Sequence, residues 1–312
     1  MKNFAIIGVG GYIAPRHIQA INDTGNITVT AMDVNDSVGV LDRYTQDVAF
    51  FKDFERFEAY VDSLKGTDKK VDYVSICSPN HLHSAHMKFG LRSGCDVICE
   101  KPLVLNESEI DELKTYEKKY GKKINTVLQL RVHESIIELK KKIDQKKRSD
   151  HEIELTYLTS RGPWYHESWK GNFQKSGGLT SNIGIHFFDM LTWIFGSIKS
   201  NELHFSNELM TSGYMELEKA KVKWILSVDR KYLPKEATDK GMTTYRSITV
   251  DGDEIEFSGG FTDLHTKVYK EVIDGKGYGL EDARTAIRIV EDLRGQQPSG
   301  VKNNSHPMLK GL

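Results

Sequence analysis

Residues 4–14 read FAIIGVGGYIA, an apolar and partly β-branched run that leads directly into a cluster of glycines. Such a run is typical of a buried strand, and glycines that follow it allow a tight turn before a helix. Backbone N–H groups at that turn can approach a pyrophosphate at the helix N-terminus. The spacing fits G-x-x-G-x-x-A with Gly8, Gly11 and Ala14, whereas in G-x-G-x-x-G the third glycine position would be Ile13.

A carboxylate follows at the expected distance from this loop. The run ITVTAMD (27–33) predicts a second strand and ends in Asp33, about twenty residues after the loop. An acid there accepts hydrogen bonds from adenosine ribose hydroxyls, and no arginine follows it to hold a 2′-phosphate. The pattern therefore favours NAD over NADP, although an ordinary strand–turn–helix with Asp33 as a turn residue remains an alternative. The candidate cofactor-binding residues of this region are Gly8, Gly10, Gly11, Tyr12, Ile13, Asp33 and Asn35.

Strand and helix patterns alternate through the rest of the first half. VDYVSIC (71–77), DVICE (96–100) and INTVLQL (124–130) are short apolar runs, as expected for strands buried on both faces of a parallel sheet. In the second half, HEIELTYLTS (151–160) alternates apolar and polar residues, and Asp251-Gly252 indicates a hairpin. The sequence predicts an α/β protein. We expect a doubly wound parallel sheet over 1–126, a second domain with antiparallel strands over 127–312, and a loose polar tail after residue 295.

Composition excludes several classes of function. The 312 residues carry a formal net charge of -1, so the chain has no broad basic field for nucleic acid or an anionic membrane. No apolar run approaches the length of about 20 residues that spans a bilayer. The N-terminal MKNFAIIGVGG is interpreted as a strand and not as a signal peptide. The three cysteines, Cys77, Cys95 and Cys99, form no CxxC pair, which fits a reducing cytoplasm.

Two motifs follow later strands, at the carboxyl ends where open α/β sheets bind ligands. In the first, Ser78-Pro79-Asn80-His81-Leu82-His83, Ser78 is a possible helix cap and Pro79 suits a first turn. The nearby histidines could suggest a metal, but no cysteine or carboxylate lies close by to complete a ligand set, so we predict none. In the second motif, Glu100-Lys101-Pro102, the proline biases Lys101 toward an extended conformation. The lysine would then bind a substrate hydroxyl or relay its proton.

The stretch SGGLTSNIGIHFFDML (176–191) places Asn182 and His186 four residues apart. On an α-helix these side chains lie on one face, and Asp189 extends the stripe. Imidazole titrates near neutral pH, so His186 is a candidate base for a hydroxyl proton, with a satisfied buried histidine as the alternative.

These motifs resemble the glucose–fructose oxidoreductase / inositol dehydrogenase / rhizopine catabolism (Gfo/Idh/MocA) family. The resemblance rests on GVGGYIA, SPNHLH, GCDVICEKP and the closing YGLEDARTAI, in matching order over the whole chain. It implies an NAD-binding Rossmann domain over 1–126, followed over 127–312 by an α/β domain with an open, mainly antiparallel sheet. It also implies a nicotinamide cofactor, NAD, and oxidation of a sugar-like secondary alcohol. The catalytic residues would be Lys101, Asn182 and His186, although the family has aspartate where this chain has Asn182.

One subgroup is more similar. VLQLRVH (127–133), SRGPWYHESWKG (160–171) and FTDLHTKVY (261–269) resemble bacterial UDP-N-acetyl-2-amino-2-deoxyglucuronate 3-dehydrogenases. The resemblance implies oxidation of the C3 hydroxyl of UDP-N-acetylglucosaminuronic acid, on the way to surface polysaccharide such as O-antigen or lipopolysaccharide. It also implies a downstream aminotransferase, a homotetramer and, in some members, NADH recycling by 2-oxoglutarate.

The resemblance completes the list of candidates. Further cofactor-binding candidates are Ser78, Pro79, Asn80, His83, Glu100, Lys101, Gln129 and Trp169. Substrate-binding candidates are Lys101, Arg131, Arg161, Tyr165, Lys170, Asn182 and His186, with His265 and Arg230 in matching stretches. A dehydrogenase of a free cyclitol or simple sugar remains the alternative enzyme. A non-catalytic NAD-binding regulator is the alternative of another class.

Overall fold

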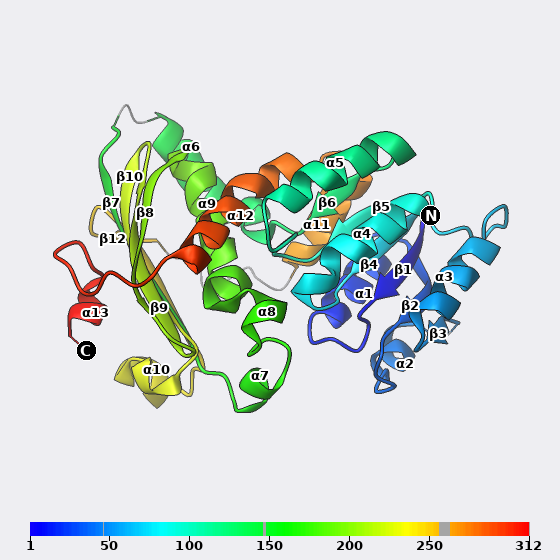
Figure 1. Cartoon of the computed structure of the whole chain (residues 1–312), viewed down its shortest axis with the longest axis horizontal. Helices are drawn as coiled ribbons and strands as arrows, with labels where there is room; N and C mark the ends of the chain where they lie inside the picture. The colour runs from blue at the N-terminus through cyan, green and yellow to red at the C-terminus, as the bar shows by residue number, and fades with distance from the viewer. Residues whose placement is uncertain (46, 146–147, 256–262, 312) are drawn as a thin grey trace. The chain divides into compact units, whose positions relative to one another are not determined.

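The computed structural model describes residues 1–45, 47–145, 148–255 and 263–311 (Figure 1). The chain forms two compact units, Met1–Gln129 with Thr262–Arg284, and Leu130–Phe261 with Thr285–Leu312. We call them the first and the second unit. The division predicted from the sequence placed everything after residue 126 in one domain, whereas the helix α11 (Leu264–Ile273) packs on α1 (Ala14–Asp23) of the first unit.

The first unit contains a six-stranded parallel sheet in the order β3-β2-β1-β4-β5-β6. The strands are β1 (Asn3–Ile7), β2 (Ile27–Met32), β3 (Ala49–Phe51), β4 (Tyr73–Ile76), β5 (Asp96–Cys99) and β6 (Ile124–Thr126). Every residue of β1 is buried, as the continuous apolar run requires for a central strand. The strand order reverses beside β1, so the carboxyl ends of β1 and β4 meet where such sheets bind ligands. The predicted doubly wound sheet is confirmed.

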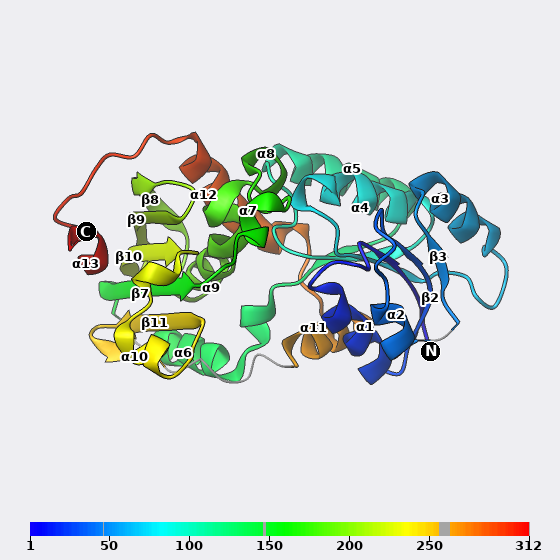
Figure 2. The ribbon, with the colours of Figure 1, turned by 90° about the horizontal axis from the view of Figure 1, so that it is seen from below.

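Helices cover both faces of this sheet. In Figure 2, α3, α4 and α5 lie on one side of the strands, and α1, α2 and α11 lie on the other. The remaining helices of this unit are α2 (Val40–Tyr44), α3 (Phe54–Ser63), η1 (Asn80–Leu82), α4 (His83–Arg92) and α5 (Ser108–Tyr120). The loops at the carboxyl ends of the strands therefore lie along one edge, held by helices on two sides.

The second unit contains a six-stranded mixed sheet in the order β12-β11-β7-β10-β9-β8. Its strands are β7 (His151–Thr159), β8 (Ile198–Ser206), β9 (Met210–Leu217), β10 (Ala220–Ser227), β11 (Thr244–Val250) and β12 (Asp253–Glu254). Within this second sheet, β7–β10 is the only parallel pair among the described strands, which confirms a mainly antiparallel sheet. Asp251 and Gly252 adopt φ values of 56° and 89°, as a two-residue hairpin of type I′ requires, so the predicted hairpin is confirmed.

Helices also flank this second sheet. Figure 1 shows α6 (Glu134–Gln145) and α9 (Ile185–Phe195) on one side and α13 (Pro307–Lys310) on the other. The Phe188 ring of α9 meets the fully buried Trp224 of β10 edge to face at 5.3 Å and anchors the helix to the sheet. The other helices are η2 (Gln129–Val132), α7 (Trp164–Glu167), α8 (Phe173–Ser176), η3 (Thr180–Gly184), η4 (Arg230–Tyr232), α10 (Lys235–Asp239) and α12 (Leu280–Gly295).

The polar tail is packed against the second unit, so the expectation of a loose tail is wrong. Ser305 and His306 are buried, and Ser305 Oγ lies 2.8 Å from His204 Nδ1. The Ser299 N–H donates to the Leu203 carbonyl at 2.9 Å. Polar residues leave no apolar pattern for sequence reasoning to detect, yet their hydrogen bonds hold the segment on β8.

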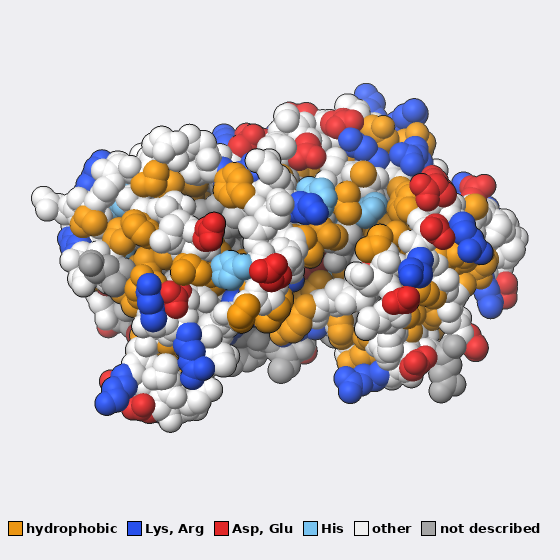
Figure 3. Space-filling model, turned by 60° about the horizontal axis from the view of Figure 1, so that its bottom comes forward, with side chains coloured by type: hydrophobic (Ala, Val, Ile, Leu, Met, Phe, Trp, Pro, Cys, Tyr) orange, Lys and Arg blue, Asp and Glu red, His pale blue; other side chains and the backbone are white. Residues whose placement is uncertain are grey.

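Two surface properties bear on function. On the face shown in Figure 3, acidic and basic side chains are interspersed, and no large region carries one sign of charge. Among the described residues, no helix is long and apolar enough to cross a membrane.

Candidate cofactor and catalytic sites

The glycine loop after β1 lies directly against the backbone that follows β4. Gly8 has φ +85°, and a Cβ added there would lie 2.7 Å from both Cys77 C and Ser78 N, so only glycine fits. The Gly10 N–H donates to Asp33 Oδ2 at 2.9 Å, and the Asn35 N–H donates to Asp33 Oδ1 at 2.9 Å. Asp33 thus fixes the loop and lies beside it, where the sequence predicted the adenosine ribose to bind.

The start of α1 suits a pyrophosphate. Within the described structure, no side chain caps this helix and its first turn carries no acidic residue, so its leading N–H groups face no competing carboxylate. The Gly11 N–H donates to the Gly8 carbonyl at 3.0 Å, which sets the tight turn before the helix. The loop, the helix start and Asp33 together fit a dinucleotide. Tyr12 is exposed at this loop.

We expect the variant Asp33→Ala to bind NAD about 10- to 100-fold more weakly, because hydrogen bonds to a charged group contribute about 1.5–3 kcal/mol. Isothermal titration calorimetry with NAD measures the change. Asp36→Ala is the matched control, because Asp36 is an exposed acid of the same loop, and its carboxylate pairs with Lys52 at 3.1 Å. Equal affinity of the two variants would exclude Asp33 from the nucleotide site.

A histidine joins the two later motifs of the first unit. The His83 ring nitrogens lie 2.8 Å from the Pro102 carbonyl and 2.9 Å from the Ser78 carbonyl, so one buried ring ties the loop after β4 to the loop after β5. The sequence suggests Ser78 as a cap of the following helix, but the structure shows that Ser78 does not cap it. Its Oγ lies instead 2.8 Å from His86 Nδ1, and the short helix η1 begins after Pro79 without a side-chain cap.

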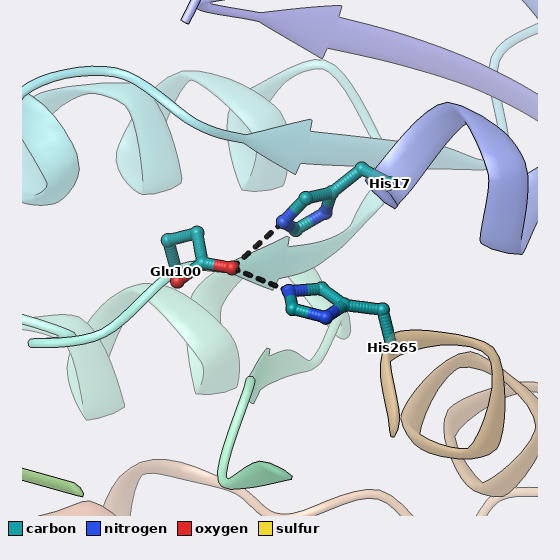
Figure 4. Close-up of side chains that lie close together, drawn as sticks. All are labelled: His17, Glu100 and His265. Carbon is teal, nitrogen blue, oxygen red and sulfur yellow. Dashed lines mark hydrogen bonds and ion pairs between the residues drawn. The ribbon is translucent and has the colours of Figure 1, made fainter. Parts of the chain in front are cut away.

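Glu100 is the centre of a buried network that comes from three segments far apart in the sequence (Figure 4). Its Oε1 accepts hydrogen bonds from His17 Nε2 at 2.8 Å and from His265 Nε2 at 2.9 Å. Its Oε2 accepts from the Lys101 N–H at 3.2 Å. The carboxylate therefore ties α1, which follows the glycine loop, to α11 and to the backbone of the candidate catalytic lysine.

The protons of this network can be assigned. His17 Nδ1 lies 2.7 Å from the Tyr269 hydroxyl, which in turn lies 2.7 Å from Ser75 Oγ. With His17 protonated at Nε2, Tyr269 donates to His17 and Ser75 donates to Tyr269, so the chain is satisfied with neutral rings. Two histidines and a glutamate could also ligate zinc by composition. The N···O separations of 2.8 and 2.9 Å are those of hydrogen bonds, and we interpret the cluster as a positioning network.

This network makes stability depend on pH. Burial lowers the pKa of His17 below its ordinary value of 6.5, against the opposing effect of its bond to Glu100. Burial opposes ionisation of Glu100, but hydrogen bonds from His17 and His265 outweigh it and hold its pKa well below 4.5. On acidification the unfolded chain takes up these protons before the folded chain does, so protonation favours unfolding.

The free energy of unfolding should therefore fall as the pH drops from 6.5, and fall further below 4.5. Glu100→Gln has no ionised carboxylate at this position, so it lacks the stability that wild type loses when Glu100 is protonated. The stability difference between wild type and variant therefore shrinks below pH 4.5. Denaturant titrations of both proteins from neutral to acidic pH measure it. A difference that stays constant through this range would contradict the assignment of an ionised Glu100.

In the second unit, Asn182 lies in a π-helical turn, η3, directly before α9. The sequence predicted a regular α-helix that stacks Asn182 over His186, so this detail is corrected. A π-turn closes i→i+5 hydrogen bonds in place of the i→i+4 bonds of an α-helix, and such turns occur frequently at functional sites. Asn182 is buried and its Nδ2 donates to the Tyr165 hydroxyl at 2.9 Å. The structure thus brings together two of the predicted substrate-binding residues.

Asp189, three residues after His186, is held by an arginine of η2. It accepts two hydrogen bonds from Arg131, from Nε at 3.1 Å and from Nη2 at 2.7 Å, and both side chains are buried. The Arg131 guanidinium also lies 5.8 Å from the centre of the Trp193 ring. Arg131 was predicted to bind substrate, and the structure shows it in an ion pair between η2 and α9.

The remaining candidates belong to several segments. Arg161 follows β7, and its buried Nε has no hydrogen-bond partner among the described residues. Lys170 lies 5.0 Å from the centre of the Trp169 ring. Gln129 begins η2, and Arg230 begins η4. His265 contacts Glu100 in the first unit.

Sequence reasoning missed His17 and Tyr269. His17 lies on the buried side of α1 beside Ile18 and Ile21. A histidine among apolar residues of one helix face indicates a buried polar partner, and this was the signal that the sequence offered. The partner itself could not be read from the sequence, because Glu100 lies 83 residues away.

Comparison with known proteins agrees with this geometry. Residues 2–127 match the family model "Oxidoreductase family, NAD-binding Rossmann fold", and residues 151–232 match its "C-terminal alpha/beta domain". The chain belongs to the Gfo/Idh/MocA oxidoreductase family, and its first domain is an NAD-binding Rossmann domain.

Among solved structures, the chain is similar to the WlbA (WbpB) dehydrogenase from Thermus thermophilus. The complex of that enzyme with NAD and alpha-ketoglutarate is 47% identical, with a TM-score of 0.95, over 98% of this chain and 99% of that one. Its complex with NAD and UDP-GlcNAcA is 46% identical, with a TM-score of 0.94 and the same coverage. The glucose-6-phosphate 3-dehydrogenase of Bacillus subtilis is 26% identical over 216 residues, which are 63% of this chain and 55% of that enzyme.

Proposed function

We propose that this chain is an NAD-dependent dehydrogenase that oxidises the C3 hydroxyl of UDP-N-acetyl-2-amino-2-deoxyglucuronate, UDP-GlcNAcA, to the 3-keto sugar nucleotide. The observation that carries the proposal is the 46% identity, over nearly the full length of both chains, to a dehydrogenase crystallised with NAD and UDP-GlcNAcA. The glycine loop and Asp33 support the cofactor. The relative named a glucose-6-phosphate 3-dehydrogenase supports oxidation at C3.

The reaction assigns a role to each catalytic candidate. Oxidation of a secondary alcohol removes a hydride from carbon and a proton from oxygen, and bound NAD supplies the hydride acceptor. His186 takes the hydroxyl proton as general base. Lys101 donates a hydrogen bond to the same oxygen and stabilises the negative charge that develops on it. Asn182 orients the substrate through its amide and through the Tyr165 hydroxyl.

The proposed reaction also indicates which reactions use its two products, the 3-keto sugar and NADH. A 3-keto sugar nucleotide is a substrate for an aminotransferase, which fits a route to amino sugars of O-antigen or lipopolysaccharide in the cytoplasm. The Thermus complex with alpha-ketoglutarate supports recycling of NADH, in which 2-oxoglutarate accepts the hydride and a proton to become 2-hydroxyglutarate. We further propose a homotetramer, and neither nucleic acid nor a membrane as partner. Light scattering after size exclusion tests the oligomeric state.

Absorbance of reduced nicotinamide tests the proposal against the alternative enzyme. The chain is incubated with NAD and either UDP-GlcNAcA or myo-inositol, with 2-oxoglutarate added to a parallel sample. The proposal predicts that UDP-GlcNAcA yields NADH, or 2-hydroxyglutarate in the parallel sample, and that myo-inositol yields neither. Turnover of the free polyol alone would assign a cyclitol or simple-sugar dehydrogenase, and NAD binding without any turnover would favour a regulator.

A further inference from the structure

The second unit contains a cavity of about 440 Å³ beside the Asn182 site. Its walls come from α7, α8, the start of η3, the turn between β8 and β9, and the carboxyl end of α12. This volume is in the range of sites that bind small molecules. Tyr165 and Thr180 lie in its wall. Because the Tyr165 hydroxyl accepts the hydrogen bond from Asn182, the cavity shares a residue with the candidate catalytic site.

Charge and an aromatic ring characterise the wall of this cavity. The formal charges among its described lining residues are Lys170 and Arg294 against the single acid Glu208, so the wall favours an anion. The Lys170 ammonium lies 5.5 Å from the centre of the Trp164 ring and 5.0 Å from that of Trp169, which holds it by cation–π contacts.

Phe173 supplies an apolar surface. Its ring lies close to the backbone of Gly178, where an added Cβ would be 3.0 Å from the ring carbon Cε2. The side chain is 55% exposed although it lines the cavity. An aromatic ring with an accessible face can stack on a planar base.

An unsatisfied hydroxyl gives an independent observation. Thr211, at the start of β9, lines the cavity and is 1% exposed, yet its Oγ1 has no hydrogen-bond partner among the described residues. A buried hydroxyl without a partner costs free energy in the folded state, and a ligand with a polar atom at this wall would remove that cost. The Tyr165 O–H is available as a second donor, since burial raises the pKa of Tyr165 and keeps its hydroxyl protonated.

We propose that this cavity binds the nucleoside diphosphate part of the sugar nucleotide. Lys170 and Arg294 bind the diphosphate, Phe173 stacks on the base, and Thr211 contributes a hydrogen bond. The shared Tyr165 wall would then leave the sugar beside Asn182. This inference rests on the proposed function, because that function supplies the sugar nucleotide as substrate.

Calorimetric titration of UDP alone into the NAD-saturated full chain tests the proposal without requiring turnover. We expect Lys170→Met to raise the Kd for UDP about 10- to 100-fold and Thr211→Val to raise it about 3- to 10-fold. Thr211→Val keeps the shape of the side chain and removes an unpaired hydroxyl, so its unfolding temperature without UDP should equal or exceed that of wild type. Lys175→Met is the matched control, because Lys175 is an exposed cation of α8 that is not part of the cavity wall.

The outcomes separate this proposal from the proposed function. Absence of UDP binding, or a Kd that changes no more in the cavity variants than in Lys175→Met, would overturn the cavity assignment even if UDP-GlcNAcA is oxidised. The expected losses of UDP affinity in a chain that oxidises no sugar nucleotide would support the cavity and refute the dehydrogenase.

Discussion

Replacing His186 with glutamine is expected to lower kcat for oxidation of UDP-GlcNAcA by about 100- to 10,000-fold, the usual contribution of a general base. Glutamine keeps a polar side chain of similar reach but cannot accept the hydroxyl proton. The Kd for NAD should stay unchanged, because the glycine loop and Asp33 belong to the first unit and His186 belongs to the second. Steady-state rates and calorimetric NAD titrations measure the two effects.

Chemical rescue distinguishes a base from a structural residue. Free imidazole should restore part of the activity of the truncated variant His186→Ala, because it can take the proton in the space that the missing ring leaves. A variant that is folded and binds NAD normally, yet loses less than tenfold in kcat, would exclude His186 as the base. Loss of activity together with loss of the folded state would assign His186 to the core.

Replacing Arg131 with methionine is expected to destabilise the second unit by about 3–5 kcal/mol, because it leaves the buried Asp189 carboxylate without its guanidinium partner. This corresponds to a fall of roughly 6–20 °C in Tm. The double variant Arg131→Met, Asp189→Leu should recover much of the loss, since replacement of both charges by apolar groups leaves no buried charge uncompensated. Calorimetry of the single and double variants measures these changes.

Arg148→Met is the matched control for Arg131→Met. The Arg148 side chain is 48% exposed and pairs with the exposed Asp150 and, at 3.2 Å, with Asp251, so its loss should cost no more than about 1 kcal/mol. If Arg131 acts as a substrate ligand, as the sequence suggested, Arg131→Met would instead raise KM and leave Tm close to the Arg148→Met value. That result would contradict the structural role assigned to the ion pair.

Local patterns predicted most of the fold. Strand periodicity and turn chemistry predicted the apolar run of β1, the glycine loop and Asp33, which lie close together in the sequence. The hairpin at Asp251-Gly252 was predicted for the same reason, since positive φ angles select few residue types. Each of these features is determined by residues within one or two neighbouring elements.

Long-range pairings could not be predicted in this way. Glu100 meets His265 across 165 residues, and Arg131 meets Asp189 across 58. Only the folded backbone places these partners together, so neither the Arg131–Asp189 ion pair nor the histidine partners of Glu100 have a signal in the sequence. The π-turn at Asn182 was missed as well, because the i, i+4 spacing of Asn182 and His186 was interpreted with α-helical geometry.

The proposed reaction breaks the C3–H bond of the sugar. UDP-GlcNAcA that carries deuterium at C3 can be incubated with the chain and NAD, and the nucleotide, the sugar and added 2-oxoglutarate can be analysed by mass spectrometry. We predict that the label leaves the sugar and appears in reduced nicotinamide, or in 2-hydroxyglutarate when the nucleotide is recycled. An oxidised sugar nucleotide that retains its deuterium at C3, or an unchanged substrate, would contradict the proposed reaction.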